Sequence, residues 1–372
     1  MIRKTTKEQL LSILQMMLKL HHTKEMENGK TQRKLLTQCQ ESAIAIGTIL
    51  EEKVEEAVKI VPLLEMYCEE VYVLAESAGT GEKIDWEYAD GMLYDVINAI
   101  QELQEVYQIV FMPYKAAMWD ALESIYLAAK DDVGCEVLVV PIPYYSFDQK
   151  QKEWIPHYEG ELFPPNIPVT SYQKYNLQEE RPDVIYVHNP YDDSNYVTSV
   201  HPSFYSAELK KYTKKLIYVP YYVTTGAVSP EHTILPVYFH MDYAIVQGER
   251  FKRGFKGLPY EDKIIPLGSP KLDRIIRMCK SGEVKMPKEW EKIVKGRRTL
   301  MLNTSIGCLL NEGSIMLDKL MWLFKKIKQY PGLALIWRPH PLLRSTIESM
   351  RPQLLMQYEE LIAYFQENGV GV

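Results

Sequence analysis

The feature that most constrains the fold is a change of hydrophobic pattern near Tyr107. From there on, short apolar runs alternate with longer segments whose apolar residues recur at helical spacing. This alternation is typical of βαβ units, in which parallel strands are buried between layers of helices. The strands that it predicts are 108–112, 135–140, 183–187, 215–219, 243–246, 263–267, 299–302 and 333–337. The sequence therefore predicts an α/β fold.

The predicted strands fall into two groups, which we interpret as two Rossmann-like domains at 107–290 and 291–372. The second domain is incomplete, because it holds two βα units and then, at 369–372, the beginning of one more strand. Between the first strands, the long run 146–180 is rich in Tyr, Pro and Gln, and we interpret it as a surface excursion that covers a cleft. The helices that the pattern predicts in these domains are 118–130, 315–329 and 345–366.

Residues 1–106 form an α-helical segment that precedes both domains. Leu36, Ala43 and Leu50 recur at seven-residue spacing and give one helix an apolar stripe. Pro62 indicates a break, Gly79 to Gly81 ends the next helix, and a further helix is expected from about 85 to 106. These helices pack on each other or on the following domain. A dimerisation coil and a helix on the membrane surface are the alternatives.

Composition narrows the class of protein. Apolar residues make up 46% of the 372 residues and the net charge is -6, which indicates a globular protein and argues against binding of nucleic acid. Five cysteines without a CxxC spacing suggest neither disulfides nor a zinc site. No leader peptide or membrane-spanning run is evident, so we expect a cytoplasmic protein, at most peripheral at the inner face of the membrane.

Ligands of open α/β sheets bind beyond the carboxyl ends of the strands, so the loops that leave each strand are the places to look for a site. The first such loop, His188 to Asp193, combines an imidazole with two carboxylates. Histidine suits proton transfer near neutral pH, and capping of local backbone is the structural alternative. The second loop, 220–226, offers the hydroxyls of Thr224 and Thr225 to phosphate oxygens, or forms an aromatic turn in the interdomain wall.

The third loop lies at 267–273. Gly268 permits close approach of the backbone, Ser269 follows it, and Lys271 lies near the start of a helix, which together favour an anion site. We expect Asp273 to cap the helix or to form a local ion pair.

The fourth loop, 337–341, carries the most specific pattern. Arg338 offers a planar fork for phosphate, His340 offers a second donor or an acid, and the flanking prolines stiffen the loop. The neighbouring predicted strand ends in three polar residues that line the same cleft, Asn303, Thr304 and Ser305.

The third and fourth loops together resemble the motifs of one family. Residues 268–273 are similar to its Gly-x-Pro-Arg-x-Asp motif, and residues 338–341 are similar to its Arg-x-His-Pro loop, in the same order and at a similar separation. With 303–305 between them, these motifs resemble the CDP-glycerol glycerophosphotransferases, the enzymes that build polymers of the teichoic-acid type. The resemblance spans about 107–372.

This resemblance implies a GT-B fold and the transfer of glycerol phosphate from CDP-glycerol to a hydroxyl of a polymer or glycan acceptor. Arg338 and His340 would then contact the pyrophosphate, and Lys271 would assist. The family's His-Gly base is replaced here by the tyrosine-rich loop 220–226, so His188 is our candidate base. The family's nucleotide-gripping Asp and Ser segment would lie beyond Val372.

Two alternatives remain at this stage. One is a nucleotide-sugar glycosyltransferase of the same fold, and the other is a non-catalytic binding or scaffold protein whose N-terminal helices pair with a partner or with a second copy. The sequence contains no GxGxxG, P-loop, GxSxG or HExxH motif, which disfavours dehydrogenases, P-loop enzymes, hydrolases and zinc proteases. It shows no carboxylates at metal-ligand spacing, so we predict activity without a metal or other cofactor.

Overall fold

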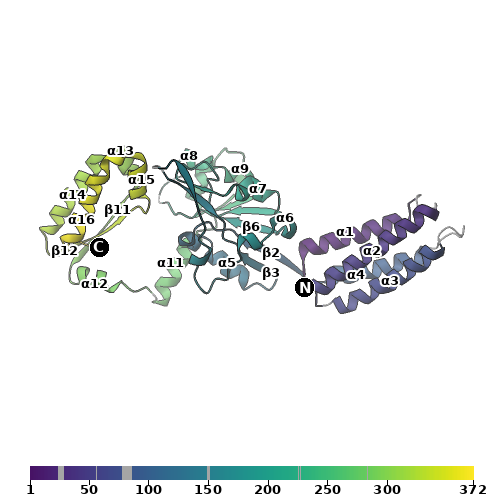
Figure 1. The fold of residues 1–372 in the computed structure, drawn as a ribbon. Helices are drawn as coiled ribbons and strands as arrows, with labels where there is room; N and C mark the ends of the chain where they lie inside the picture. Colours follow the sequence, from purple (N-terminus) through teal and green to yellow (C-terminus); the bar gives the residue numbers. More distant parts are fainter. Residues whose placement is uncertain are drawn as a thin grey trace. The chain divides into compact units, whose positions relative to one another are not determined.

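The computed structural model describes residues 1–23, 29–55, 57–77, 86–148, 151–224, 226, 228–282 and 284–372 (Figure 1). The chain forms two compact units. The first contains residues 1–144, 157–195 and 199–274, and the second contains residues 145–156, 196–198 and 275–372. The N-terminal helices and the first large sheet thus belong to the same unit.

The N-terminal segment of the first unit is a bundle of helices. They are α1 (Lys4–His21), α2 (Gly29–Lys53), α3 (Ala57–Ser77) and α4 (Glu87–Glu102). Leu36, Ala43 and Leu50 of α2 are fully buried, and they share one core with apolar residues of the other three helices. The prediction that these helices pack on each other is confirmed.

The predicted break at Pro62 is wrong. The chain leaves the helical conformation after Lys53 and returns to it at Ala57, and α3 then continues through Pro62. Pro62 is exposed, so water can satisfy the backbone carbonyl that loses its helical hydrogen bond there. The predicted helix end at Gly79 to Gly81 lies outside the described residues.

The first unit also contains a seven-stranded parallel sheet. Its strands run in the order β3-β2-β6-β8-β9-β10, and β1 pairs with the first residues of β2. The strands are β1 (Ile2–Arg3), β2 (Glu105–Phe111), β3 (Cys135–Val139), β6 (Val184–Val187), β8 (Lys215–Tyr218), β9 (Tyr243–Ile245) and β10 (Ile264–Ile265). Starting from β2, the chain first adds a strand on one side and then builds outward on the other. This is a doubly wound Rossmann-like order, and its switch point lies between β2 and β6.

Short helices connect the strands of this sheet. The α-helices are α5 (Glu123–Lys130), α6 (Leu177–Glu180), α7 (Ser206–Lys210), α8 (Pro230–Thr233), α9 (Val237–His240), α10 (Glu249–Lys252) and α11 (Pro270–Ser281). The 3-10 helices are η2 (Ala116–Ala121), η3 (Gly160–Leu162), η4 (Tyr172–Lys174), η5 (Pro202–Phe204), η6 (Arg253–Phe255) and η7 (Glu261–Lys263). The predicted helix 118–130 is therefore a 3-10 turn followed by a short α-helix.

The predicted excursion 146–180 contains regular structure. Strands β4 (Tyr144–Asp148) and β5 (Glu153–His157) join β7 (Thr198–Val200) in a small sheet of order β5-β4-β7. Whether this segment covers a ligand stays a prediction.

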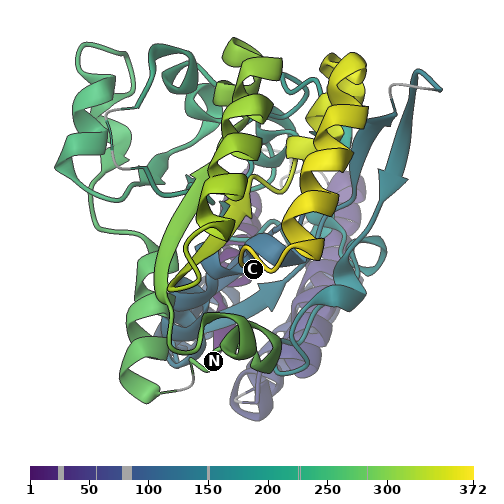
Figure 2. The same ribbon diagram turned by 90° about the vertical axis from the view of Figure 1, so that its left-hand side faces the viewer.

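The C-terminal part of the second unit is a smaller Rossmann-like layer of sheet and helices (Figure 2). The parallel strands β11 (Arg298–Thr304) and β12 (Leu333–Pro339) are accompanied by helices α12 (Lys288–Val294), α13 (Ile306–Glu312), α14 (Ser314–Lys328), α15 (Leu343–Met350), η8 (Pro352–Leu354) and α16 (Leu355–Glu367). Residues 370–372 bond to β12 in parallel, which confirms the predicted start of a third strand. The single helix predicted at 345–366 is wrong, because α15 ends at Met350 and Pro352, which has no N–H to extend the hydrogen bonds of α15, begins the 3-10 helix η8 that precedes α16.

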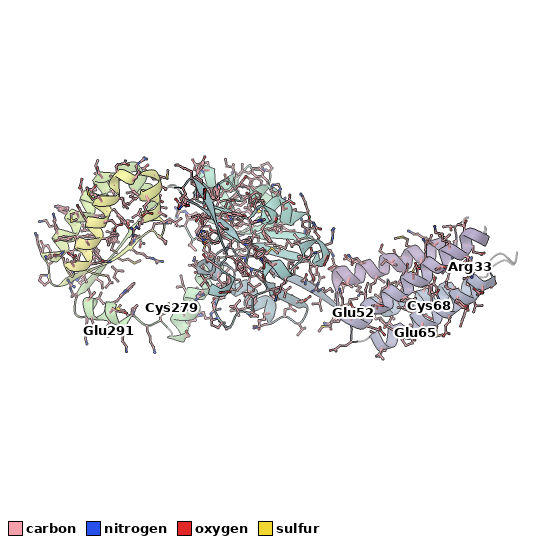
Figure 3. The ribbon with its side chains drawn as sticks, in the orientation of Figure 1. Arg33, Glu52, Glu65, Cys68, Cys279 and Glu291 are labelled. Atoms are coloured by element: carbon pink, nitrogen blue, oxygen red, sulfur yellow. The ribbon has the colours of Figure 1, made fainter. Side chains whose placement is uncertain are left out.

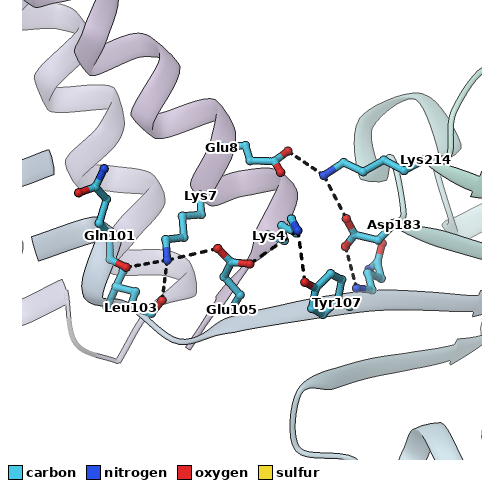
Figure 4. A network of polar contacts seen from close by, with 10 residues as sticks. Lys4, Lys7, Glu8, Gln101, Leu103, Glu105, Tyr107, Asp183 and Lys214 are labelled. Atoms are coloured by element: carbon cyan, nitrogen blue, oxygen red, sulfur yellow. Dashed lines mark hydrogen bonds and ion pairs between the residues drawn. The ribbon is translucent and has the colours of Figure 1, made fainter. Parts of the chain in front are cut away.

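Charged side chains fix the bundle to the sheet (Figure 4). Lys7 is buried and donates to the carbonyl oxygens of Gln101 and Leu103, each at 2.8 Å, just where α4 ends. The guanidinium of Arg3 pairs with Glu136 and Glu180 at the start of the sheet. Because a cation near a helix C-terminus satisfies its free carbonyls, Lys7 stabilises the end of α4 as well as the contact with α1.

Candidate functional site

The switch point of the first sheet places His188 and Tyr114 side by side. His188 follows β6, Tyr114 follows β2, and the backbone N–H of Tyr114 donates to Nε2 of His188 at 3.2 Å. The imidazole is fully buried between the rings of Tyr114 and Tyr221, with centroids 5.2 and 6.4 Å away. Burial lowers the pKa of His188 to about 3, and the charge of Lys271 acts in the same direction. A neutral, enclosed imidazole is weakly suited to take a proton from a substrate, so its role as a base stays a prediction.

The carboxylates that follow His188 serve the backbone. Asp192 is buried and accepts hydrogen bonds from the backbone N–H of Ser206 at 3.0 Å and from its hydroxyl at 2.6 Å. Ser206 begins α7, so Asp192 satisfies the free N–H of the first residue of that helix. The structural alternative expected for this loop is a histidine that caps local backbone, whereas the capping group is Asp192 and the helix lies beyond the intervening strand β7.

A cation at the same switch point was missed by sequence reasoning. Lys115 is half-buried, with its Nζ 4.9 Å from the ring centroid of Tyr144. Burial lowers the pKa of Lys115, and the carboxylate of Glu159 opposes that shift. Glu159 is itself held by the backbone N–H of Ala116 at 2.8 Å and by the Tyr144 hydroxyl at 2.6 Å. Lys115 directly follows the predicted strand 108–112 and its turn, so a strict search of every strand end would have found it.

The loop after β8 is held by its neighbour. The backbone N–H of Thr224 donates to Oε1 of Gln247 at 2.9 Å, and Nε2 of Gln247 donates back to the Thr224 carbonyl at 2.5 Å. The Thr224 hydroxyl is engaged with Gly226, donating to its carbonyl at 3.1 Å. Gly268 and Ser269 line a narrow crevice together with Gln247, beyond the ends of β8, β9 and β10. Thr225, the other predicted ligand in this loop, lies outside the described residues.

Lys271, predicted to bind an anion, already has an anionic partner. Its Nζ lies 2.6 and 2.8 Å from the two carboxylate oxygens of Asp120 in η2. Asp273, in the first turn of α11, accepts a hydrogen bond from the hydroxyl of Ser124 at 2.8 Å, which is neither the cap nor the local ion pair expected of it. A substrate phosphate would have to compete with Asp120 for Lys271. That ion pair could not be predicted from sequence, because its two members lie 151 positions apart along the chain.

In the second unit the predicted residues meet at one edge of the sheet. Asn303 and Arg338 are register partners, each one residue before the end of its strand. Thr304 is buried, and its hydroxyl accepts from the Trp337 indole at 3.2 Å. The Thr304 carbonyl accepts from the backbone N–H of His340 at 2.9 Å, which holds the loop against β11. Thr304 therefore holds the loop after β12 in place at this edge of the sheet.

The exposed groups at this edge are suited to an anion. Arg338 is exposed, and across the described parts of the chain it forms no ion pair. Nδ1 of His340 accepts from the backbone N–H of Leu342 at 3.2 Å, which assigns the ring proton to Nε2. Partial burial lowers the pKa of His340, so the neutral form is favoured at pH 7. The hydroxyl of Ser305, by contrast, caps α13 by accepting from the N–H of Cys308 at 3.3 Å.

Groups of three or more His, Cys, Asp or Glu side chains arranged to hold a metal do not occur within the described ranges. Nor does any described helix combine the length and the apolar character needed to cross a membrane.

The fold and these strand-end groups define a class of protein: an α/β protein with two Rossmann-like sheets in succession, the arrangement along the chain of the GT-B class. No family model matches the chain, and no curated protein matches it either.

Solved structures give a remote likeness. S. aureus MnaA with UDP has a TM-score of 0.46 at 12% identity, over 72% of this chain and 68% of that one. The UDP-GlcNAc 2-epimerase of Neisseria meningitidis with UDP-GlcNAc has a TM-score of 0.41 at 11% identity, over 69% and 70% of the two chains. That of Methanocaldococcus jannaschii has a TM-score of 0.42 at 13% identity, over 71% and 74%.

Proposed function

We propose that this protein is a transferase that binds a nucleotide-diphosphate-linked donor, with the pyrophosphate at the carboxyl edge of β11 and β12. The observation that carries the proposal is the register pairing of Asn303 with Arg338. Directly paired residues of neighbouring strands project from the same face, so an amide and a guanidinium flank one point on this edge. A guanidinium binds two phosphate oxygens at once through its parallel N–H groups.

His340 adds a donor without adding a charge. With Nδ1 engaged by the backbone of Leu342, the N–H at Nε2 is the group left to a ligand. A neutral imidazole can donate this hydrogen bond to a phosphate oxygen as negative charge builds up on the leaving nucleotide. Because such donors act by position, catalysis would depend on the stiffness that the two prolines give to this loop.

The first unit holds a second set of groups in our proposal, at the carboxyl ends of its own strands. Lys115 is the cation of the switch point, where ligands of doubly wound sheets bind. Lys271, Gly268, Ser269, Thr224 and Thr225 remain proposed donor-binding residues, as predicted from sequence. His188 remains the proposed base, and Lys115, whose pKa is lowered by burial, is the alternative.

The identity of the donor is a finer proposal. CDP-glycerol follows from the motif resemblance at 268–273 and 338–341. A nucleotide sugar is the alternative that the sequence left open, and UDP-GlcNAc, the ligand named for two of the similar structures, is a suitable probe of it. Either donor presents a pyrophosphate to Arg338.

The experiment is calorimetric titration with CDP-glycerol, CDP, UDP-GlcNAc and UDP on the full chain and on three variants. Losing a bidentate, charge-assisted contact in Arg338→Ala should weaken binding by about 10- to 100-fold, and Arg338→Lys should recover only part of it. Arg298→Ala is the matched control, since Arg298 is exposed at the opposite end of the same strand pair. Equal losses in Arg338→Ala and Arg298→Ala, or no binding of any of the four ligands at millimolar concentration, would overturn the proposal.

The transfer step needs its own readout. Mass spectrometry of the released nucleotide, CMP from CDP-glycerol or UDP from UDP-GlcNAc, distinguishes the two donors when a polyol or glycan acceptor is supplied. His188→Ala and Lys115→Met are compared in the same assay. Normal turnover in the folded His188→Ala variant removes that residue from the mechanism.

A further inference from the structure

The outer face of α3 and α4 in the N-terminal bundle carries an open groove in which apolar side chains are partly exposed. The groove is lined by side chains of both helices, namely Met66, Glu87, Tyr88, Gly91, Met92 and Asp95. Met66 and Tyr88 are 48% and 61% exposed, whereas the core below them is complete, with Tyr67 and Leu93 fully buried. Met92 also packs against that core, whereas exposed apolar side chains that gather on a surface, here Met66 and Tyr88, indicate a place where another molecule binds.

The shape of the groove suits a helix. Neighbouring helices leave a furrow between them into which the ridge of a third helix can pack. Gly91 lies on the groove side of α4, and a Cβ built there would meet nothing within 4 Å. The absent side chain leaves room for a partner to approach the α4 backbone closely. A glycine in mid-helix costs the bundle stability, so its presence fits a site where close approach matters.

The charge around the groove selects the partner. Two of the six lining residues, Glu87 and Asp95, are carboxylates and none is basic. Of the eight carboxylates on α3 and α4, Asp90 pairs with His21 and His22 and Glu76 pairs with Arg33, and Lys59 is the single basic residue of the two helices. Glu65, labelled in Figure 3, and Asp95 are exposed beside the apolar residues. By contrast, α1 carries three lysines and one glutamate. An acidic rim around an apolar floor attracts a partner with basic residues around an apolar stripe.

We propose that this α3–α4 groove binds a basic amphipathic helix of a partner protein. The same charges argue against the two other occupants expected of these helices. A membrane surface rich in anionic lipid would be repelled, because interfacial helices bind it through lysine and arginine. A symmetric pair of copies would bring two acidic faces together.

The probe is an 18-residue peptide of leucine and lysine patterned as an amphipathic helix, compared with a scrambled peptide of the same composition. Binding is followed by fluorescence anisotropy on the full chain at low and high salt. We expect the amphipathic peptide to bind at least about 10-fold more tightly than the scrambled peptide. Its affinity should fall as the salt concentration rises, because salt screens partly exposed charge pairs. Equal affinity for the two peptides, or no binding of either peptide, would overturn the proposal.

Two pairs of variants locate the site. Gly91→Trp fills the groove and should weaken binding by at least about 10-fold, whereas Gly91→Ala adds one methyl group and should change it less than about 3-fold. Asp95→Lys should weaken binding more than Glu102→Lys, which makes the same charge change on the same helix outside the groove. This second pair still decides the question if Gly91→Trp fails to fold.

Other occupants give different outcomes in the same set of proteins. If sedimentation velocity shows a dimer that Gly91→Trp dissociates, the groove binds a second copy of this chain and not a partner helix. If the chain floats with vesicles and Gly91→Trp abolishes this flotation, the groove binds a lipid surface. Either result overturns the proposal.

Discussion

Substitution of Gly371 by alanine should detach the third strand of the second sheet. A Cβ at this position would lie 1.7 Å from the carbonyl oxygen of Leu335 and 2.6 Å from its carbonyl carbon. Both atoms belong to the backbone of β12 at the centre of the sheet, so no side-chain rotation relieves the clash. Residues 370–372 must move away instead.

The cost can be worked out from the contacts that this movement breaks. Main-chain hydrogen bonds join Leu335 N–H to the Val370 carbonyl at 3.1 Å, Val372 N–H to the Leu335 carbonyl at 2.9 Å, and Trp337 N–H to the Val372 carbonyl at 2.7 Å. At about 1 kcal/mol each, they contribute about 3 kcal/mol. Val370 is fully buried in the core of this unit, and its exposure costs about 1.5–3 kcal/mol more. Allowing for partial relaxation, we expect a loss of about 3–5 kcal/mol.

Hydrogen exchange read by mass spectrometry on the full chain measures this loss locally. Protection of the amides in β12 should fall by at least about 100-fold, because each 1.4 kcal/mol corresponds to a factor of about ten. Gly332→Ala is the matched control, since a Cβ there meets nothing within 4 Å and the residue precedes the same strand. Unchanged protection of β12 in Gly371→Ala would refute the steric argument, and an equal loss in Gly332→Ala would show that any glycine change perturbs this unit.

Three further predictions concern stability and activity. Lys7→Met keeps the aliphatic stem but leaves two carbonyl oxygens at the end of α4 without their donor. The free energy of unfolding, measured with urea, should therefore fall by about 2–3 kcal/mol. The control Lys19→Met changes an exposed lysine and should alter this free energy by less than about 0.5 kcal/mol. Burial lowers the pKa of both His21 and His188 below the unfolded value near 6.5, so the unfolded chain binds more protons than the folded chain below that pH, and stability falls as the pH is lowered. For His188, whose folded pKa is about 3, the free energy of unfolding should fall by about 2 kcal/mol between pH 6.5 and 5. Calorimetry at several pH values would detect this loss, and an unchanged melting temperature over this range would contradict it. Transfer activity should survive EDTA, and an activity lost in EDTA and restored by magnesium would show that the predicted metal independence is wrong.

Much of the candidate site could be located from sequence, because the apolar pattern predicts where the strands end. The apolar runs before His188, Thr224, Gly268 and Arg338 identify the strands, and parallel strands place their following loops at one edge of a sheet. The pairing of Asn303 with Arg338 follows the same logic. What could not be predicted is whether each side chain at that edge is buried or already paired. Burial of an imidazole depends on rings brought in by other strands.

The sequence by itself determined the α/β class, the helical start and the succession of most strands along the chain, because apolar periodicity and turn residues are local properties of the chain. Only the tertiary structure decided that Lys271 is paired with Asp120, that His188 is enclosed and that Gly371 must lack a side chain. It also revealed the groove around Gly91, which no motif indicates. Ion pairs, desolvation and steric exclusion depend on which distant segments meet in space, and a pattern of neighbouring residues does not contain that information.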